Sequence, residues 1–323
     1  MNILVLESDA PDYASHLESL SHDITYARNP AEVSTVHDVL LARPDYAVEY
    51  IHKYGEPQWI QSTWAGITPL VGVARSALVT GVKGIFGPLM SEYVFAYLLE
   101  DIRDLPRSYT QQSARHWQPY LPQTLQNRHL VIVGTGSIGE HIATTARLFN
   151  MRVTGVSRTG QPNAAFDHTT DTSELNNVAS DADYLILVLP DTPSTRGLID
   201  SSTLDSLPSH AMLINVGRGH SLDHVALAKA LESGALRRAV LDVFPEEPLP
   251  KDSELWTTLN ITITPHISAV SFPADVAKIF KKNLESYEHG DEMDFVVDLA
   301  QGYRNRRSEY GRTLPHRYRA LGV

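Results

Sequence analysis

The sequence contains no cysteine among its 323 residues, which excludes disulfides, thiolate metal sites and thiol nucleophiles. It also lacks an apolar run near the roughly 18 residues that a membrane span needs. Its first residues, "MNILVLESDA", have neither the basic start nor the long apolar core of a signal peptide. We therefore expect no membrane partner and a cytoplasmic protein whose chemistry comes from histidine, carboxylates, arginine or a cofactor.

The sequence also has few basic residues relative to acidic ones, with 27 Lys and Arg against 38 Asp and Glu, which gives a formal net charge of −11. This balance argues against nucleic acid as a main partner, because phosphate backbones bind basic surfaces. An acidic protein that binds an anionic substrate needs a local group of Arg, His or backbone N–H donors to overcome its own field. We expect such donors within apolar motifs, and no metal site.

Alternating apolar and polar segments predict an α/β protein of two domains. The first 90 residues contain four strand-like runs, "NILVLES", "YAVEYI", "PQWIQSTWAGI" and "ALVTGVKG", typical of a small open parallel sheet. Helical spacing over 90–105, after the Gly87-Pro88 break, predicts the start of a second unit. A further helix over 273–290 would return the chain to the first unit. We expect a domain of residues 1–89 completed by 275–323, and a second domain of residues 90–274.

The second unit reads as a doubly wound parallel sheet. Several of its strands are apolar on both faces, as strands covered by helices on both sides should be. Six strands are predicted between residues 129 and 268: "LVIVG", "RVTGVS", "YLILVLP", "AMLINVG", "RRAVLDVF" and "ITITPHIS".

The first of these strands leads into a glycine motif. Gly134, Gly136 and Gly139 have the G-x-G-x-x-G spacing, with a strand before them and an apparent amphipathic helix after them. In that context the glycines permit a tight turn, close approach of a pyrophosphate to the backbone and close packing of helix on strand. The helix N-terminus then offers free N–H groups to phosphate. A tight turn without a ligand is the alternative.

The second strand ends without the expected acid. NAD-specific units place a carboxylate there, about 20 residues beyond the glycines, to bind the ribose hydroxyls. Here the strand ends Ser157-Arg158-Thr159, and the first acid beyond it is Asp167. An arginine flanked by two hydroxyls suits the 2′-phosphate of NADP, so NADPH is expected in preference to NADH. A solvated arginine on a turn is the alternative.

Three later strands each end in one ionisable group: Arg218, Glu247 and His266. Ligands of open α/β sheets bind outside the carboxyl ends of the strands, so these groups are expected to converge beside the nicotinamide. Individually they could be a surface ion pair, a loop charge and a core histidine. Together, behind a dinucleotide loop, they favour one functional site over those separate roles. An arginine fork matches a carboxylate, and a carboxylate beside an imidazole favours its protonated form, which can donate a proton.

In these motifs the chain resembles the D-isomer-specific 2-hydroxyacid dehydrogenase family. The resemblance rests on "VIVGTGSIGEHIA", "LVLPDTPSTRGLI", "LINVGRGHSLD", "LDVFPEEPLP" and "TPHISA", and covers about residues 90–290. "SARHWQP" and the "EEPLP…LW" segment are most similar to the bacterial glyoxylate/hydroxypyruvate reductases. The resemblance implies two Rossmann-like or flavodoxin-like lobes and reduction of glyoxylate or hydroxypyruvate to a D-2-hydroxy acid.

The resemblance also implies roles for individual residues. Arg218 would bind the substrate carboxylate and carbonyl, His266 would be the acid/base, and Glu247 would support His266. Trp64 and the backbone N–H groups of Ala65 and Gly66 would line the substrate site, although a core tryptophan is equally compatible with Trp64. The cofactor-binding residues implied are Gly134, Gly136, Ser137, Ile138, Gly139, Ser157, Arg158, Thr159, Leu189, Pro190, Thr195, Val216, Gly217, Asp242 and Ser268.

Two other functions remain compatible with the motifs. A nucleotide-sensing binding module on the same fold could retain the same three ionisable residues. A formate dehydrogenase is a third hypothesis, but that branch pairs its histidine with glutamine where this chain has Glu247.

The resemblance implies a homodimer, and we expect it to form through the coenzyme-binding lobe, involving residues 105–125, "LPRSYTQQSARHWQPYLPQTL". This segment holds Tyr109, Trp117, Tyr120 and two arginines, residue types favoured at interface hot spots. A loop folded back on its own domain is the alternative. The last twenty residues carry six Arg against one Glu, and would form a solvated tail or an arm on a neighbouring subunit.

Overall fold

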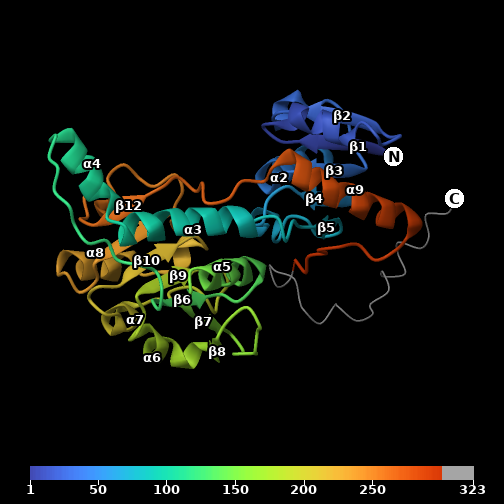
Figure 1. The fold of residues 1–323 in the computed structure, drawn as a ribbon. Coiled ribbons are helices and arrows are strands. Elements are labelled where there is room, and N and C mark those ends of the chain that lie inside the picture. Colours follow the sequence, from blue (N-terminus) through green and yellow to red (C-terminus); the bar gives the residue numbers. More distant parts are fainter. Residues whose placement is uncertain (300–323) are drawn as a thin grey trace. The chain divides into compact units, whose positions relative to one another are not determined.

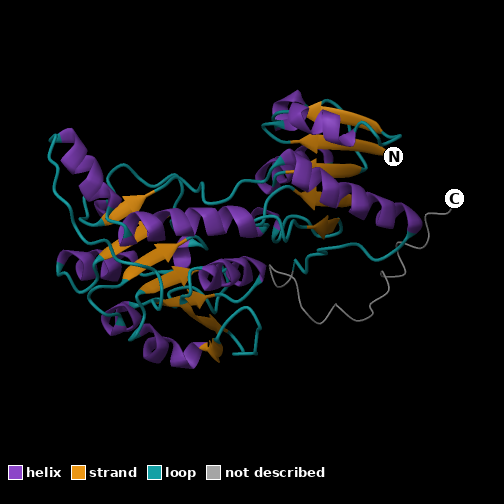
Figure 2. Ribbon diagram, viewed as in Figure 1, coloured by secondary structure: helices purple, strands orange, loops and turns teal. Residues whose placement is uncertain are grey.

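The computed structural model describes residues 1–299, and the chain divides into two compact units (Figure 1). Among the described residues, unit 1 combines Met1–Ile85 with residues 271–299, and unit 2 is Phe86–Val270. Each unit is a sheet of parallel strands with helices packed on it (Figure 2). The predicted α/β class with two parallel sheets is confirmed. The role of unit 1 as the substrate domain, with limits at residues 89 and 275, stays a prediction.

The sheet of unit 1 has five strands in the order β2-β1-β3-β4-β5. The strands are β1 (Asn2–Leu6), β2 (Asp23–Ala27), β3 (Val39–Ala42), β4 (Trp59–Ser62) and β5 (Leu78–Thr80). The helices are α1 (Ala14–Leu17), α2 (Pro44–Tyr54) and α9 (Pro273–His289). Although α9 follows unit 2 in the chain, it packs in unit 1, where Phe280 stacks on Trp59 with ring centroids 5.1 Å apart. Asn283 donates a hydrogen bond of 3.0 Å from that helix to Gln61.

Part of the strand prediction for unit 1 was wrong. Residues 46–51, "YAVEYI", lie in α2 and not in a strand. Their alternation suits either structure, but Pro44 begins the helix and Gly55 ends it with φ +85°, the punctuation typical of a helix. Strands β2 and β3 were missed. The first is an edge strand with one buried residue, and the second has only four residues.

Unit 2 contains seven parallel strands in the order β12-β11-β10-β9-β6-β7-β8. They are β6 (His129–Val133), β7 (Arg152–Ser157), β8 (His168–Asp171), β9 (Tyr184–Leu187), β10 (Met212–Asn215), β11 (Arg238–Leu241) and β12 (Ile261–Ile263). Six of them were predicted. The missed strand, β8, lies at the sheet edge and has no buried residue, so it carries no hydrophobic signal. The order reverses between β6 and β9, which is where doubly wound sheets bind ligands.

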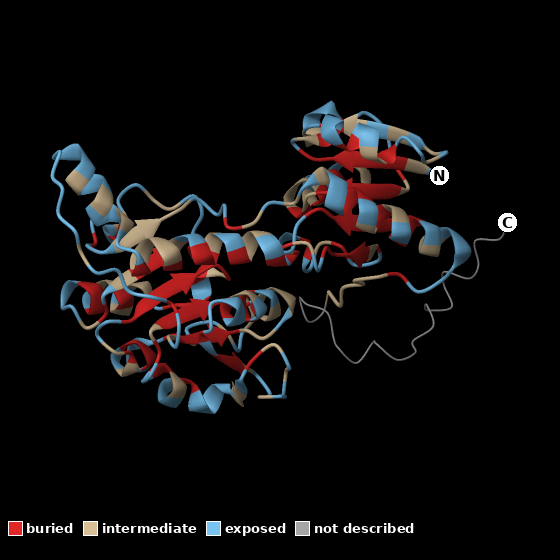
Figure 3. Ribbon diagram, in the orientation of Figure 1, coloured by how far each residue is buried: buried red, intermediate tan, exposed pale blue. Residues whose placement is uncertain are grey.

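Helices cover both faces of this sheet. Leu130 and Ile132 of β6 belong to one core cluster with α3 (Gly87–Ile102) and α5 (Ser137–Leu148). Val131 and Val133 point to the opposite face, into a cluster with α6 (Leu175–Ala179), α7 (Ser201–Ser206) and α8 (His224–Glu232). Figure 3 shows the strands between these helices as buried. Both faces therefore need apolar residues, which explains the continuous apolar runs in the sequence.

The first helix of unit 2 begins earlier than predicted. Helix α3 starts at Gly87, and Pro88 lies in its first turn, where a missing N–H leaves no intrahelical hydrogen bond unmade. The Gly87-Pro88 pair therefore belongs to the helix and does not precede it. A second helix, α4 (Leu105–Ser113), follows α3 and forms the first part of the predicted dimerisation segment.

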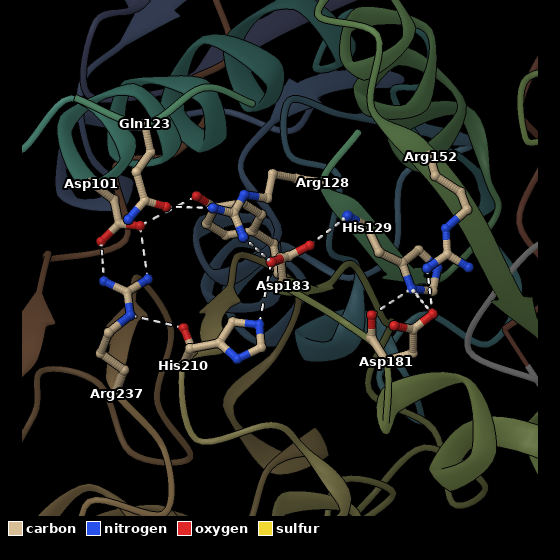
Figure 4. Close-up of polar contacts among 10 residues, drawn as sticks. Asp101, Gln123, Arg128, His129, Arg152, Asp181, Asp183, His210 and Arg237 are labelled. Carbon is tan, nitrogen blue, oxygen red and sulfur yellow. Dashed lines mark hydrogen bonds and ion pairs between the residues drawn. The ribbon is translucent and has the colours of Figure 1, made fainter. Parts of the chain in front are cut away.

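The amino ends of the unit 2 strands form one edge of the sheet, which we call the amino edge, and its charges are paired (Figure 4). Asp183, just before β9, accepts hydrogen bonds from Arg128 at 2.7 Å and from the backbone N–H of His129 at 2.8 Å. The His210 imidazole lies 3.2 Å from the same carboxylate. Arg237, just before β11, donates to both oxygens of Asp101 at 2.5 and 2.8 Å.

A second pair lies on the same edge. Arg152, the first residue of β7, donates a hydrogen bond to the carboxylate of Asp181 (Figure 4). Both side chains are more than half exposed. These networks tie the loops before four strands to one another and to the end of α3.

Candidate active site

The opposite edge of the unit 2 sheet, the carboxyl edge, begins with the glycine motif. Gly134 follows β6 with φ +115°, and a Cβ added there would lie 2.5 Å from the carbonyl oxygen of Val188, so only glycine fits. Gly136 is the N-cap of α5, and a Cβ there would meet nothing within 4 Å. Ser137, Ile138 and Gly139 form the first turn of that helix. Open space before free N–H groups suits the pyrophosphate of a dinucleotide.

Ser157 ends β7, and Arg158 and Thr159 are exposed beyond it. The two nearest acids are engaged elsewhere. Asp167 accepts the backbone N–H of Val153 at 2.9 Å, and Asp171 caps the turn that follows it through Ser173. Within residues 1–299, no carboxylate lies within 4 Å of the Arg158 guanidinium. A cation is therefore free at the position where NAD-specific units hold an acid.

Two further loops at this edge carry predicted cofactor residues. Leu189, Pro190 and Thr195 follow β9, and the Thr195 hydroxyl donates to the Pro190 carbonyl at 2.6 Å. Val216 and Gly217 follow β10, and a Cβ on Gly217 would lie 2.5 Å from the Leu189 nitrogen. Strand β9 lies next to β6, and β10 lies next to β9, so these loops follow the glycine motif along the same edge.

His266 and Glu247 are in direct contact. The Nδ1 atom of His266 lies 2.7 Å from Oε2 of Glu247, and the other carboxylate oxygen accepts the backbone N–H of Phe244 at 2.8 Å. Burial alone would raise the pKa of Glu247. The hydrogen bonds from His266 and Phe244 and the charges of His266 and Arg218 outweigh burial, so this pKa lies below its usual value. Because Nδ1 faces the carboxylate, Nε2 is the nitrogen left for a substrate.

His266 has a left-handed backbone, with φ +53°, which is unfavourable for a residue other than glycine. The fully buried carboxylate of Asp242 holds the segment around it. Asp242 accepts the Thr264 hydroxyl at 2.6 Å and the backbone N–H groups of Ile267 and Ser268 at 2.8 Å each. The hydroxyl of Tyr93 in α3 lies 2.6 Å from that of Thr264. Asp242 therefore fixes the histidine from both sides of the chain.

Arg218 is mostly buried. Its Nη1 donates to the carbonyl of Gly217 at 2.7 Å, and no carboxylate in the described part of the chain lies within 4 Å of its guanidinium. Burial lowers the pKa of Arg218, against the opposing charges of Glu247 and Asp191. A Cβ on Gly219 would lie 2.0 Å from the carbonyl carbon of Phe244, so glycine brings the Arg218 loop against the Glu247 loop. The three predicted ionisable residues lie on adjoining loops of one unit.

The family model for the NAD-binding domain of D-isomer specific 2-hydroxyacid dehydrogenases matches residues 95–268. This range covers more than half of the chain and includes Arg218, Glu247 and His266. The chain belongs to this family. A family member from Aeromonas salmonicida is similar over 92% of this chain and 99% of its own, with 42% identity and a TM-score of 0.89.

Two other dehydrogenase structures are similar over nearly the whole chain. One, from Xanthobacter autotrophicus and in complex with NADPH, shares 27% identity over 93% of this chain and 99% of its own, with a TM-score of 0.83. The other is an NADPH-dependent glyoxylate/hydroxypyruvate reductase from Sinorhizobium meliloti. It shares 23% identity over 94% of this chain and 99% of its own, also with a TM-score of 0.83, so it supports the dehydrogenase fold alone.

The predicted substrate loop of this dehydrogenase lies in unit 1. Trp64, Ala65 and Gly66 follow β4, and Trp64 is about one-third exposed with 36% of its surface accessible. Trp64 is therefore not a fully buried core residue. The loop and the three ionisable residues belong to different units.

Sequence reasoning missed the support behind His266. Both oxygens of Asp242 accept hydrogen bonds from the histidine segment, a support that the sequence did not indicate, and its predicted role at the cofactor stays a prediction. Thr264 and Tyr93 were not predicted at all. The available signal was weak: a threonine two residues before the histidine and a tyrosine within an apolar helix.

No helix within residues 1–299 has both the length and the apolar character needed to cross a membrane. Over the same range, no group of three or more His, Asp and Glu side chains is arranged to hold a metal ion. The Arg-rich tail, residues 304–323, lies outside the described residues.

Proposed function

We propose that this dehydrogenase reduces small 2-keto acids to 2-hydroxy acids, with glyoxylate and hydroxypyruvate as the foremost substrates and the D-isomer formed where the product is chiral. The observation that carries the proposal is the contact of His266 with Glu247 beside Arg218, whose guanidinium has no acidic partner among residues 1–299. A buried, unpaired guanidinium is unfavourable unless an anion binds to it, and a carboxylate matches its planar fork. Motifs "SARHWQP" and "EEPLP…LW" favour this substrate class.

The chain's own residues supply binding and proton transfer. Arg218 holds the substrate carboxylate and polarises the keto group, where negative charge develops as the carbonyl is reduced. His266 donates a proton from Nε2 to that oxygen, while Nδ1 remains bonded to Glu247. When bound along the loop after β6, a nicotinamide cofactor supplies the hydride. Asp242 keeps the histidine segment in place during the reaction.

The test is turnover of a panel of 2-keto acids with NADH and NADPH, followed as loss of reduced-cofactor absorbance. Glyoxylate and hydroxypyruvate should be the best substrates. A protein that binds dinucleotide with micromolar affinity but reduces none of the acids would favour the nucleotide-sensing module instead. Reduction confined to larger keto acids would reject the proposed substrates but retain the reaction class.

We also propose that NADPH is preferred over NADH because Arg158 binds the 2′-phosphate. The free guanidinium at the end of β7 supports this, and the Xanthobacter relative is in complex with NADPH. Removing one or two charge-assisted hydrogen bonds changes binding by about tenfold or more. Arg158→Ala should therefore reduce the NADPH preference in kcat/KM by at least about tenfold.

The same strand provides a matched control. Arg152 is the first residue of β7 and is paired with Asp181, so Arg152→Ala removes the same charge from the opposite edge of the sheet. It should leave the cofactor preference unchanged. Wild-type preference for NADH, or equal effects of the two variants, would reject a phosphate site at Arg158.

The homodimer is the third part of the proposal. The segment of residues 105–125 folds as α4 and a return in which Tyr120 contacts the hydroxyl of Ser108 at 2.6 Å. It leaves Tyr109, Trp117 and Leu121 at 61%, 95% and 97% exposure, an unusual amount of apolar surface in one short segment. A second copy would cover it. Sedimentation at micromolar concentration should give twice the chain mass of 35.8 kDa, and a monomer only would reject the dimer.

A further inference from the structure

The carboxyl edge of the unit 1 sheet gathers three polar side chains that the sequence did not single out. Glu7, Arg43 and Thr63 are each the first residue after a strand, namely β1, β3 and β4. These strands are neighbours in the sheet, so their ends lie side by side. Thr63 immediately precedes the predicted substrate loop of Trp64, Ala65 and Gly66.

Glu7 is a buried carboxylate, with 6% of its surface exposed. Its Oε2 accepts the Thr63 hydroxyl at 2.6 Å, and its Oε1 accepts the backbone N–H and hydroxyl of Ser8 at 3.0 and 3.2 Å. Arg43 brings a guanidinium nitrogen to 3.9 Å from Oε1. Burial of a carboxylate is unfavourable without such partners. The contact with Thr63 spans the intervening strand β3 and ties the end of β4 to the end of β1.

Arg43 holds the next residue of the loop. Its guanidinium lies 4.4 Å from the ring centroid of Trp64 and 4.4 Å from that of Tyr46. Asp45 fixes the guanidinium with two hydrogen bonds of 2.7 and 2.9 Å. A cation over an aromatic face is attracted to it, so the partly exposed indole is held in one place. The Ser62 hydroxyl also donates to the Trp64 carbonyl at 2.9 Å.

We propose that Glu7 and Arg43 are positioning residues that set the geometry of the substrate loop. Glu7, through Thr63, fixes the backbone so that the N–H groups of Ala65 and Gly66 face the substrate carboxylate. Arg43 fixes Trp64 as a wall beside the third carbon of the substrate. We name Glu7, Arg43, Thr63 and Trp64 the loop brace. The inference rests on the proposed function, because it assigns the substrate role to this loop.

The brace makes different predictions for its two halves. A carboxylate is common to all 2-keto acids, so loss of the Glu7–Thr63 contact should weaken the binding of glyoxylate and of hydroxypyruvate equally. Of these two substrates only hydroxypyruvate has a third carbon, so loss of the Arg43–Trp64 contact should weaken the binding of hydroxypyruvate more than that of glyoxylate. Neither change should alter the KM for NADPH, whose predicted residues all lie in unit 2.

The first experiment compares Thr63→Val with Thr63→Ser. Valine keeps the shape and removes the hydroxyl, whereas serine retains the hydroxyl. Thr63→Val should raise the KM of both keto acids about 5–20-fold, with kcat within about threefold of wild type, and Thr63→Ser should restore most of the lost affinity. An unchanged KM in Thr63→Val, or equal losses in the two variants, would overturn the role of Glu7. The role of Glu7 would also be overturned if the KM for NADPH rose as much as the KM for the keto acids.

The second experiment uses the partly exposed Arg43, which does not depend on the stability of Thr63→Val. Arg43→Gln should raise the KM of hydroxypyruvate at least about threefold more than that of glyoxylate. Equal changes for the two substrates would overturn the assignment of Arg43 and Trp64 as a wall.

Amide hydrogen exchange provides a measurement independent of turnover. Exchange at residues 63–67 should accelerate in Thr63→Val and Arg43→Gln, while exchange in strand β6 stays unchanged. Unchanged exchange in the loop would overturn the brace, whatever the protein reduces. If loop exchange accelerates in the two variants but the wild-type protein reduces no keto acid, the proposed function is overturned and the brace is a purely structural feature.

Discussion

The two edges of the unit 2 sheet use the same residue types in opposite ways. At the amino edge, Arg128, Arg237 and Arg152 each donate to a carboxylate. At the carboxyl edge, Arg218 and Arg158 have no carboxylate within 4 Å in residues 1–299. A paired charge contributes to the fold, whereas an unpaired charge at a ligand-binding edge is available to an anion. For these five arginines, the presence or absence of a carboxylate partner, and not the residue type, distinguishes the three at the amino edge from the two proposed to bind ligands.

The largest effect on activity should come from His266. His266→Ala removes the proton donor and should lower kcat by about 10²–10⁴-fold. Its side chain is 44% exposed, so the thermal stability should change little. Steady-state turnover with a saturating keto acid measures the effect. Near-normal turnover would remove His266 from the mechanism and erase the functional side of the comparison.

Arg218→Lys should have the next largest effect. Lysine keeps the charge but loses the planar fork, so kcat/KM should fall by about 100-fold through a higher KM for the keto acid and a lower kcat. The KM for NADPH is the internal control and should stay within about twofold. Wild-type kinetics in this variant would mean that Arg218 does not bind the substrate carboxylate.

Asp183→Ala tests the amino edge. It removes the acceptor of Arg128, His129 N–H and His210, and should destabilise unit 2 by about 2–3 kcal/mol without changing kcat/KM. Asp181→Ala is the matched control, because Asp181 is 70% exposed and its pair should contribute less than about 1 kcal/mol. Urea midpoints of the two variants measure the difference. An activity loss in Asp183→Ala at unchanged stability would contradict the division between the edges.

The smallest predicted effect is a shift in pH dependence. A neighbouring carboxylate favours imidazolium, the form that donates a proton in reduction. Glu247→Gln removes that charge, so the descending limb of the pH–rate profile for reduction should move to lower pH. The pKa of Glu247 is lowered, so its carboxylate stays ionised across the neutral range and below its usual titration. An unmoved limb would mean that the contact between the two side chains does not govern proton donation.

Much of unit 2 could be predicted because its strands are buried on both faces. Continuous apolar runs such as "LVIV" and "YLIL" mark such strands, and the rule that ligands bind at strand carboxyl ends placed Arg218, Glu247 and His266 together. Edge strands β2 and β8 escaped prediction because they bury almost nothing.

The supporting contacts could not be predicted for a different reason. Asp242, Thr264 and Tyr93 meet only through folding, as do Glu7 and Thr63, and no local pattern marks a hydrogen bond between distant segments. A buried acid in an apolar run, as at Glu7 and Asp242, was a further weak hint. Such acids must find partners, but the sequence does not say which ones.

The return of α9 to unit 1 has a consequence for synthesis of the chain. Residues 86–270 form one uninterrupted unit, so unit 2 can complete its fold as it leaves the ribosome. Unit 1 is made first but must wait for α9, whose Phe280 covers the face of Trp59. During that interval the Trp59 face that Phe280 covers in the finished unit lacks its partner. The nascent first unit is therefore the stage at which chaperone binding or aggregation would act on this chain.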